Sequence, residues 1–321
     1  MCGAILRRLI LDLVIFLGSL ALLLAAARTF TVSAEYIGLR LGMSPFAVGV
    51  LIVSVGTSLP EMISSIVAVT RGSSEIVVGN VLGANLSNLL LVMGVVAITA
   101  PREMRLGEQY ILIDLHYLLG AVCLLALALK DAVLGRVEGA VLLVAYGTYV
   151  TYLLREGRTE KDLLVGVDKE ERRALLVPLA TLAGSALLIF VGARFTVSSL
   201  EGIATGLGVA PAIIAVTVLS LGTTLPELVV SATAARAGKA DVAVGNILGS
   251  CVFNTLGVAG LAALVGEVRA TPDLLSLPLP VFAASALLFY LLTLDKRVSR
   301  WEGIIFVLLY VLFVLEISRL A

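Results

Sequence analysis

The sequence predicts an all-α membrane protein with ten transmembrane helices, arranged as two inverted-topology five-helix repeats. Three observations predict this fold class: an excess of apolar residues, ten apolar segments of membrane-spanning length, and two short motifs that each occur twice along the chain. The first two indicate a bilayer environment, and the third indicates that the two halves share one architecture.

The composition is far more apolar than that of a soluble domain. Of the 321 residues, 60% are hydrophobic and 14% are charged, and the mean hydropathy is +1.08. Soluble domains average roughly 45–50% apolar and about 25% charged residues. The net charge is zero, so nothing indicates a nucleic-acid partner. The lone His116 and the scattered Cys2, Cys123 and Cys251 form no ligand-spaced cluster, which argues against a zinc site, a haem or a disulfide framework.

A membrane helix needs about 20 mostly apolar residues. The chain offers ten such segments: 9–27, 43–69, 76–99, 110–129, 137–154, 174–194, 208–235, 242–265, 277–294 and 301–318. The charged linker 155–173 separates a first repeat, 1–154, from a second, 174–321. The start of the chain also resembles a cleaved signal peptide, with Arg7-Arg8 before an apolar run. We reject that interpretation because the first span has a counterpart in the second repeat.

The distribution of basic residues predicts the orientation in the membrane. With the N-terminus outside, 15 of the 23 Lys and Arg residues fall on the cytoplasmic side. This bias follows the positive-inside rule. We therefore expect a multi-pass protein of the plasma membrane with both termini outside and the linker 155–173 in the cytoplasm.

Two motifs recur at an offset of 166 residues. Ser-Val-Gly-Thr-Ser-Leu-Pro-Glu at 54–61 matches Ser-Leu-Gly-Thr-Thr-Leu-Pro-Glu at 220–227 in six of eight positions. Gly-Asn-Val-Leu-Gly-Ala-Asn-Leu-Ser-Asn at 79–88 matches 245–254 in five of ten. Because each half holds an odd number of spans, the second copy enters the membrane from the opposite side. The motifs of the two halves can then meet near the bilayer midplane, where transporters often place an ion site.

Glu61 and Glu227 each lie in the middle of a long apolar segment. An ionised carboxylate there costs at least about 2.5 kcal/mol, and a cation held between the two would offset this cost. The structural alternative is a pair of protonated glutamates, but ionisable residues inside a membrane are functional by default. These two residues are the predicted centre of a metal site.

Pro60 and Pro226 precede the two glutamates and are expected to interrupt their helices. Proline lacks an N–H and displaces the carbonyl four residues earlier, which here belongs to Gly56 or Gly222. Irregular backbone at this depth is tolerated where it is packed in protein or lines a wet cavity. We therefore expect free carbonyl oxygens beside each carboxylate, with a simple packing kink as the alternative.

Hydroxyl and amide groups follow the same spacing in both halves. Thr57 and Thr223 lie four residues before the glutamates, on the same helix face, and Ser58 and Thr224 adjoin them. Asn88 and Asn254 each lie 27 residues after their glutamate, with Ala84 and Ser250 one turn earlier. Interhelical hydrogen bonding is the alternative role for these groups, as for Asn80, Asn85 and Asn246. The glycines Gly79, Gly83, Gly245 and Gly249 indicate close helix packing.

All of these candidate ligands are oxygen atoms. Calcium takes 6–8 oxygen ligands in flexible geometry, whereas magnesium requires strict octahedral geometry with retained waters. Soft metals would require Cys or His ligands. The set therefore predicts Ca²⁺ or Na⁺ as the bound and transported ion.

These motifs resemble the repeats of the sodium/calcium exchanger family, in the cation/calcium exchanger superfamily. The resemblance rests on 56–61, 222–227 and the two Gly-Asn-x-x-Gly segments. It implies ten helices in two inverted repeats, and antiport of Na⁺ against Ca²⁺ by alternating access, with both ions competing for one midplane site. Carried over by position, it implies oxygen ligands from Glu61, Glu227, Thr57, Thr223, Ser58, Thr224, Ser250, Asn88 and Asn254, and backbone carbonyls from Ser54 and Ser220.

The chain departs from the family pattern at two positions. Ala84 stands where the family often has a hydroxyl that helps to bind Na⁺, so one sodium site is expected to be weak. Asn254 stands where several members have aspartate, which by resemblance argues against the potassium-dependent branch. The short linker leaves no room for the regulatory loop of animal members. We expect a compact transporter of the prokaryotic type that functions as a monomer.

The mechanism expected from these observations is ion-dependent switching. Either ion neutralises the buried carboxylates and permits the site to change sides, while the first and sixth helices, ending near Arg28 and Arg194, slide past the core. The alternatives are a Ca²⁺/H⁺ exchanger that uses the same glutamates, and a passive cation channel. An enzyme is not expected, because no His-Glu-x-x-His motif or nucleophile with a positioned base occurs. No prosthetic group is expected; lipid and the transported Ca²⁺ and Na⁺ are the expected partners.

Overall fold

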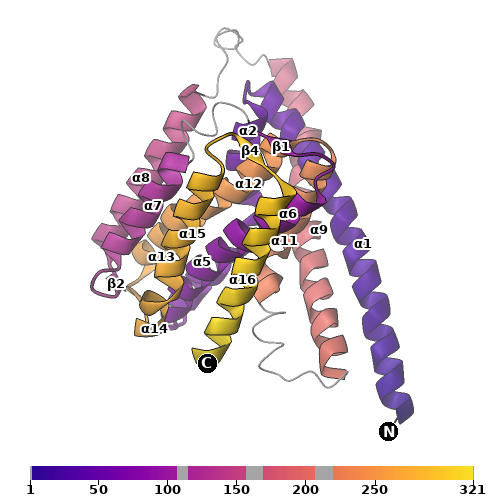
Figure 1. Cartoon of the computed structure of the whole chain (residues 1–321). Coiled ribbons are helices and arrows are strands. Elements are labelled where there is room, and N and C mark those ends of the chain that lie inside the picture. The colour runs from indigo at the N-terminus through magenta and orange to yellow at the C-terminus, as the bar shows by residue number, and fades with distance from the viewer. Residues whose placement is uncertain (1, 107–114, 157–168, 207–219, 321) are drawn as a thin grey trace.

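The computed structural model describes residues 2–106, 115–156, 169–206 and 220–320 of the chain. These residues form a bundle of long helices with four two-residue strands in the connections (Figure 1). Large apolar side chains such as Leu17, Val144 and Leu308 are exposed on the outer helices. Such a surface fits a lipid environment, as the composition predicts.

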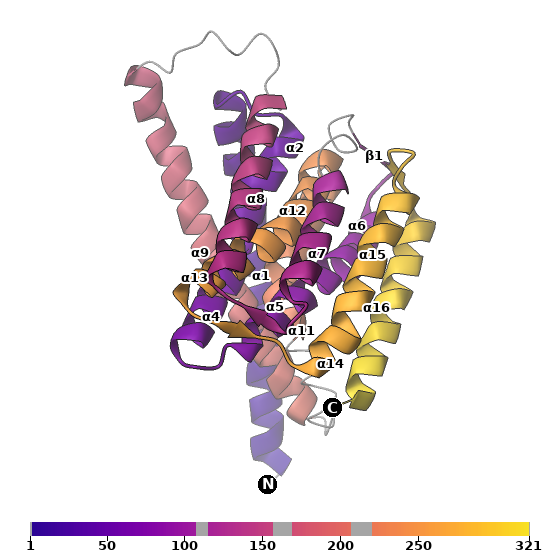
Figure 2. The ribbon, with the colours of Figure 1, turned by 90° about the vertical axis from the view of Figure 1, so that its left-hand side faces the viewer.

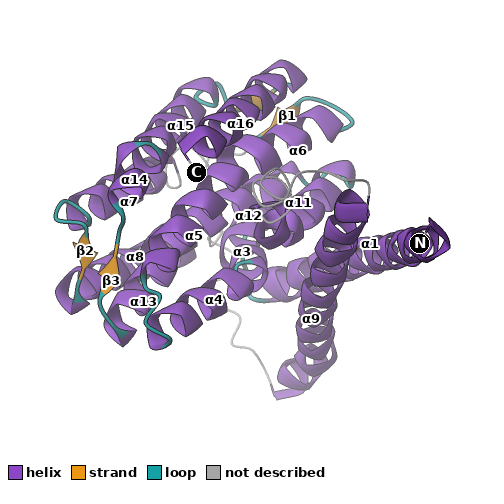
Figure 3. Ribbon diagram, turned by 90° about the horizontal axis from the view of Figure 1, so that it is seen from below, coloured by secondary structure: helices purple, strands orange, loops and turns teal. Residues whose placement is uncertain are grey.

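Two very long helices, α1 (Cys2–Arg40) and α9 (Lys169–Gly206), pack against each other beside the rest of the bundle (Figure 3). They run antiparallel, because Asp12 adjoins Gly202, whereas Leu23, further along α1, adjoins Gly192, an earlier residue of α9. Between these contacts the Thr196 hydroxyl lies 2.9 Å from that of Ser19.

The predicted limits of these two helices, 9–27 and 174–194, are wrong. Arg28 and Arg194 were expected at helix ends, but both lie inside continuous helices that extend twelve residues further. A single charged side chain on the helix surface does not stop a helix, because its long stem carries the charge away from apolar surroundings.

The first motif lies on a broken span, as Pro60 predicts. Short helices α2 (Pro45–Val48) and α3 (Ser54–Thr57) flank a π-helical segment, η1 (Gly49–Val53), and α4 (Leu59–Thr70) follows. The helix breaks at Ser58, and the two parts are bent by 44°. Pro60 therefore falls in the first turn of α4, where its missing N–H leaves no bond unmade.

The second motif differs from this expectation. Helix α11 (Ser220–Arg236) continues through Pro226 without a break in the described residues. Pro226 lies in the second turn of the described part of α11. There it removes the hydrogen bond to the Gly222 carbonyl, and the helix continues despite that loss.

The two central spans are the most buried part of the molecule. One consists of α5 (Glu75–Leu86), η2 (Ser87–Val92) and α6 (Met93–Thr99), and the other of α12 (Ala240–Val252), η6 (Phe253–Val258) and α13 (Ala259–Val265). In the most apolar stretch of each span, 78% and 89% of the residues are buried, against 17% for α1. The π-helical segments η2 and η6 start at positions 166 residues apart, the offset of the sequence motifs.

Glycines bring the second central span against the first motif. A Cβ at Gly249 would lie 2.6 Å from the Val50 carbonyl oxygen, and one at Gly245 would lie 2.7 Å from that of Phe46. The small-residue packing predicted for this pair is therefore confirmed. Gly79 and Gly83 hold the equivalent positions on α5, and the segment expected against them, 211–219, lies outside the described residues.

The outer helices are α7 (Leu115–Ala128), α8 (Arg136–Glu156), α14 (Pro272–Ser276), α15 (Pro278–Leu292) and α16 (Arg300–Leu320). Strand β1 (Met104–Arg105) pairs with β4 (Arg297–Val298), and β2 (Val133–Leu134) pairs with β3 (Val268–Arg269), both antiparallel. Each pairing joins a connection of the first half to one of the second. Figure 2 shows both chain ends at the end of the bundle opposite β1.

Local caps recur between the halves as well. Glu138 accepts a hydrogen bond from the Gly135 N–H at 3.1 Å, and Glu302 accepts one from the Ser299 N–H at 2.6 Å. Both residues stand three positions into a helix, α8 or α16, and satisfy an N–H of its start.

The structure contains seven helices long and apolar enough to cross a membrane, or eight with the bent pair, among the described residues. Of the ten predicted spans, 110–129 and 208–235 begin in residues outside the description, and α7 and α11 are their described parts. The multi-span membrane architecture is confirmed, while the count of ten stays a prediction.

We predict that Gly249→Ala destabilises the protein by about 1–3 kcal/mol, the usual cost of overpacking. The new methyl group would lie 2.6 Å from the Val50 carbonyl oxygen and 2.7 Å from Ser54 Oγ. The measurement is the midpoint of thermal unfolding in detergent. The control is Gly147→Ala on the exposed face of α8, where no described atom lies within 4 Å. Equal midpoints for the two variants would contradict close packing at Gly249.

Candidate cation site

The two predicted carboxylates lie together at the centre of the bundle. Glu61 is in the first turn of α4 and Glu227 is on α11, and their exposed fractions are 1% and 0%. The two side chains are close enough to repel each other electrostatically. Neither makes an ion pair with a described Lys, Arg or His residue. Within the described part of the chain, the two adjoining acids therefore have no basic side chain that compensates their charge.

Hydroxyl groups link the carboxylate of one half to the motif of the other. The Ser58 hydroxyl donates to Glu227 Oε1 at 3.2 Å and lies 3.0 Å from the Ser250 hydroxyl. The Thr57 hydroxyl also faces the Glu227 carboxylate. Ser58 sits at the break between α3 and α4, so the break aims its side chain across the interface.

The amides of the second motif approach in a crossed arrangement. Segment η2, which carries Asn88, packs against α11, and η6, which carries Asn254, packs against α4. Each asparagine therefore lies on a segment that packs against the glutamate-bearing helix of the opposite half. Both side chains are buried, and their amide oxygen and nitrogen atoms have no hydrogen-bond partner among the described residues.

Further polar residues lie around these groups, and two of them, Ser65 and Ser231, are not among the ligands predicted from the sequence. The Asn246 amide donates to Ser231 Oγ at 2.8 Å, and its oxygen accepts from the Thr57 hydroxyl at 3.2 Å. The Asn80 amide donates to Ser65 Oγ at 3.1 Å. Ser65 and Ser231 each stand four residues after a glutamate, and this shared spacing was the signal that could have found them.

The structure describes some of the remaining predicted ligands and not others. The Ser54 carbonyl accepts the Ser58 N–H at 2.9 Å. The Thr57 hydroxyl lies 3.2 Å from this carbonyl and 3.2 Å from Asn246 Oδ1, and its single proton can be donated to only one of them at a time. Thr224 and Ala84 are buried. The side chains of Ser220 and Thr223 lie outside the described part of the structure, so their predicted roles stay predictions.

The donor set fits a hard cation. Glu61 Oε1 and Oε2, Glu227 Oε2, and the amide oxygens of Asn88 and Asn254 are all buried without a partner in the described structure. Burial of unpaired charge costs several kcal/mol per ion. The described residues contain no group of three or more His, Cys, Asp or Glu side chains suited to a metal ion. Only two ligands of the set therefore carry charge, and the rest are neutral oxygens.

A cavity of about 670 Å³ adjoins the site and separates it from α9. Its wall includes Gly56, Thr57 and Pro60 on one side, and Ile189 and Phe190 on the other. Phe30 of α1 also lines it and packs against Gly56, where a Cβ would meet the ring at 2.6 Å. Space beside the first motif is thus bounded by the α1–α9 pair.

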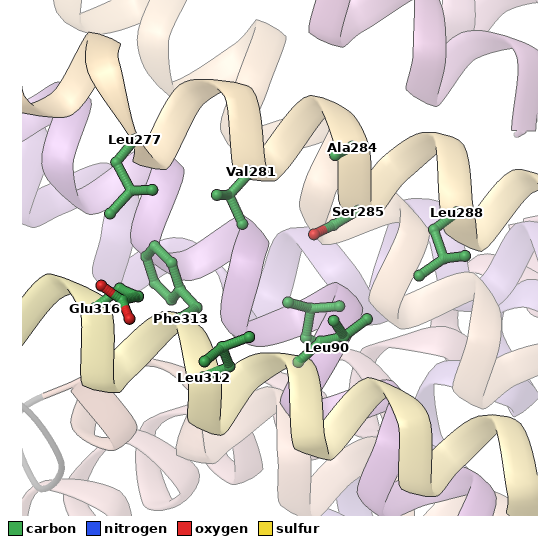
Figure 4. A pocket seen from close by; sticks show the side chains of 10 residues that line it. Leu90, Leu277, Val281, Ala284, Ser285, Leu288, Leu312, Phe313 and Glu316 are labelled. Carbon is green, nitrogen blue, oxygen red and sulfur yellow. The ribbon is translucent and has the colours of Figure 1, made fainter.

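A second cavity, of about 330 Å³, lies between α15 and α16 and is unrelated to the carboxylates. Figure 4 shows Leu277, Val281 and Phe313 lining it, with Glu316 at one end. Glu316 is exposed to a large extent and forms an ion pair with Arg319 at 2.6 Å. Its charge is therefore already compensated.

Comparison with known proteins identifies the family. The profile described as sodium/calcium exchanger protein matches residues 11–155 and 177–318, which is most of the chain. The chain belongs to the sodium/calcium exchanger family. Both matched segments contain one copy of each motif, so the family profile covers every residue of the candidate site.

Similar exchangers and membrane proteins come from bacteria and archaea. The chain is 32% identical to the putative antiporter CaxA of Alkalimonas amylolytica, over 91% of this chain and 94% of that protein. It is 28% identical to the sodium/calcium exchanger MaX1 of Methanosarcina acetivorans, over 94% and 96%. Inner membrane protein YrbG of Escherichia coli is 29% identical over 89% of each chain.

A solved structure of the sodium-calcium exchanger NCX_Mj, soaked with zero Na⁺ and Ca²⁺, has the same fold. The TM-score is 0.81 at 26% identity, and the match covers 96% of this chain and 99% of that one. The family assignment therefore rests on sequence and fold together, and it places this chain among transporters.

We predict that the effects of Asn246→Ala and Ser231→Ala on the free energy of unfolding are coupled. Each removes the same 2.8 Å bond and leaves its partner buried without a hydrogen bond, at a cost of about 1–3 kcal/mol. The double variant should therefore lose about 1 kcal/mol less than the sum of the single losses. Thermal unfolding midpoints measure the cycle. Asn246→Ala combined with Ser64→Ala is the control, because Ser64 makes no bond to Asn246, and strict additivity in both cycles would contradict the contact.

Proposed function

We propose that this exchanger performs secondary active antiport of Na⁺ against Ca²⁺, with both ions competing for the site between Glu61 and Glu227. One observation carries the proposal: two buried carboxylates, one from each half, adjoin each other, and three of their four oxygens have no described partner. A divalent cation matches their combined charge of −2, and sodium ions can supply the same charge in steps. Ionised carboxylates at this depth are stable only when such a charge accompanies them.

The proposed ligands are the oxygens that converge on the two acids. Glu61, Glu227, Thr57, Ser58, Ser250, Asn88 and Asn254 supply side-chain oxygens, with Thr223, Thr224 and the carbonyls of Ser54 and Ser220 completing the set. Calcium accepts many oxygens in flexible geometry, which suits ligands spread over both halves. In this conformation the Ser54 carbonyl accepts the Ser58 N–H at 2.9 Å, and its second lone pair would be offered to the ion.

The two halves are proposed to be inverted repeats. Strands β1 and β3 follow equivalent spans, α6 and α13, yet each pairs with the other half's later strand, β4 or β2. Figure 1 places β1 and β2 at opposite ends of the bundle. Because β3 pairs with β2, the equivalent strands β1 and β3 lie at opposite ends as well. This exchange of ends supports inversion. The bias of basic residues supports the proposed orientation, with both termini outside and the linker 155–173 in the cytoplasm.

Alternating access is proposed to use the α1–α9 pair as the moving part. The two helices pack mainly on each other, and the ring of Phe30 meets the core at Gly56 beside the site. Glu35 of α1 also forms an ion pair with Lys239, next to the start of α12. Movement of the pair along the core would expose the cavity at Thr57 to one side or the other. The unit that moves is one chain, and we propose that it functions as a monomer.

Exchange of Ca²⁺ for H⁺ on the same glutamates is the second candidate. Ala84 replaces a hydroxyl that the equivalent Ser250 supplies in the other half, so the chain offers one oxygen fewer for sodium. The similarity to exchangers named for sodium and calcium favours the sodium reaction.

We predict that an outward Na⁺ gradient, with Na⁺ loaded inside the vesicles, drives ⁴⁵Ca uptake into proteoliposomes at clamped pH. Ca²⁺ is taken up against its own gradient because Na⁺ leaving down its gradient supplies the free energy through the shared site. A K⁺ gradient or a pH gradient of equal size should give no uptake above that of protein-free vesicles. Uptake driven by the pH gradient alone would favour proton exchange, and uptake that needs no counter-ion would indicate a channel.

We predict that Glu61→Gln and Glu227→Gln each abolish sodium-driven calcium uptake. Either change leaves a single carboxylate, which cannot neutralise a divalent cation in a buried site. The control is Glu316→Gln, an exposed acid on α16 paired with Arg319, which should transport like the parent protein. Thermal unfolding of each variant confirms that it folds. Parent-like uptake by either site variant would refute the shared-carboxylate site.

A further inference from the structure

A polar cavity of about 840 Å³ lies far from the cation site, at the end of the bundle where β1 and β4 pair. It is lined by residues 100–105, between α6 and β1, and by the turn from α11 to α12. Three arginines line it, Arg102, Arg105 and Arg236, together with a single acid, Glu103. All four side chains are exposed, and none of the arginines makes an ion pair within the described structure. The cavity therefore carries an excess of positive charge.

The strand pair beside this cavity places one of these arginines, Arg105, face to face with a further positive charge. Arg105 of β1 is directly opposite Arg297 of β4. Opposed side chains in an antiparallel pair point to the same face, and like charges in this position are destabilising. An anion bound between them would remove the repulsion.

The equivalent strand pair at the other end of the bundle has no such conflict. There Arg269 is opposite Val133, and it forms an ion pair with Glu267 at 2.5 Å. Glu103 precedes Arg105 by the same two positions, yet the two make no ion pair in the described structure. One strand pair thus has its arginine in an ion pair, while the arginines of the other have no such partner among the described residues.

The walls of the cavity are held in place by contacts that involve no ligand. Arg300 donates to the Ala100 carbonyl at 3.2 Å and fixes the end of α6. Ala240 begins α12, so a helix N-terminus with its unpaired N–H groups faces the cavity. The neighbouring acids are Asp241, in the first turn of α12, and Asp295, which accepts from the Arg297 N–H at 3.1 Å.

We propose that this cavity binds a phosphate group, supplied by the headgroup of an anionic phospholipid or by a soluble phosphate. Guanidinium groups recognise phosphate oxygens with paired hydrogen bonds, and arginine is the preferred residue for this contact. The cavity lies at the ends of the apolar helices α6 and α11, the level at which lipid headgroups meet a membrane protein. The basic-residue bias also predicts this end to face the cytoplasm, whose leaflet is negatively charged.

The test is a titration of the full-length protein in neutral detergent, with the thermal unfolding midpoint as the readout. The probes are dioctanoyl phosphatidylglycerol, dioctanoyl phosphatidylcholine and inorganic phosphate. A ligand that binds only the folded protein raises the midpoint with concentration. We expect phosphatidylglycerol to raise it and phosphatidylcholine to have no comparable effect. A rise with inorganic phosphate as well identifies a soluble phosphate as a sufficient source.

Three variants and one control test whether the ligand binds in this cavity. Arg105→Gln and Arg236→Gln should each weaken the apparent affinity about tenfold or more, since each removes a charged hydrogen-bond donor. Glu103→Gln should strengthen it, because it removes the acid of the cavity, and poor folding cannot produce that result. Arg269→Gln, at the equivalent strand of the other end, is the matched control and should bind like the parent.

Equal responses to phosphatidylglycerol and phosphatidylcholine would overturn the proposal, as would unchanged affinity in both arginine variants. The readout involves no ion flux, so this result is independent of the transport measurements. If phosphate binding is refuted, the proposed cation site is unaffected, and if the cation site is refuted, the proposal for this cavity is unaffected.

Discussion

The structure depends on the burial of two mutually repelling carboxylates, Glu61 and Glu227, at the centre of a lipid-facing bundle. Water at the surface would stabilise these charges, whereas a low-dielectric interior penalises each by several kcal/mol. Three of the four carboxylate oxygens have no described partner, and Ser58 gives the remaining one a single hydrogen bond. The proposed cation would balance this charge, and in that proposal the need for it links ion binding to the conformation of the protein.

Local irregularities of the helices serve this one site. The break at Ser58 turns its hydroxyl toward Glu227, and the segments η2 and η6 carry the two unpartnered asparagines toward the opposite half. Close backbone packing at Gly245 and Gly249 brings α12 against the first motif, so Ser250 can meet Ser58. Regular helices with larger side chains would hold these oxygens too far apart.

The two halves repeat each other in their elements but differ in the chemistry of a few positions. Ser250 bonds to Ser58, while the equivalent residue of the first half is Ala84. Lys239 joins α1 through Glu35, while the residue 166 positions earlier is Ser73. Within the described residues, Arg269 of one strand pair forms an ion pair, whereas Arg105 and Arg297 of the other do not. The two halves thus share their elements, whereas several of their polar and charged positions differ.

The sequence by itself determined the membrane class, the repeated motifs, the pair of buried acids and the break before Pro60, because apolar length, offset and proline chemistry are local properties. It misplaced the ends of α1 and α9, since helix length here depends on packing between the two helices. Only the tertiary structure decided that Asn246 and Ser231 support Thr57, and that Arg105 faces Arg297. Contacts between distant segments depend on how the halves pack, which no spacing along one chain records.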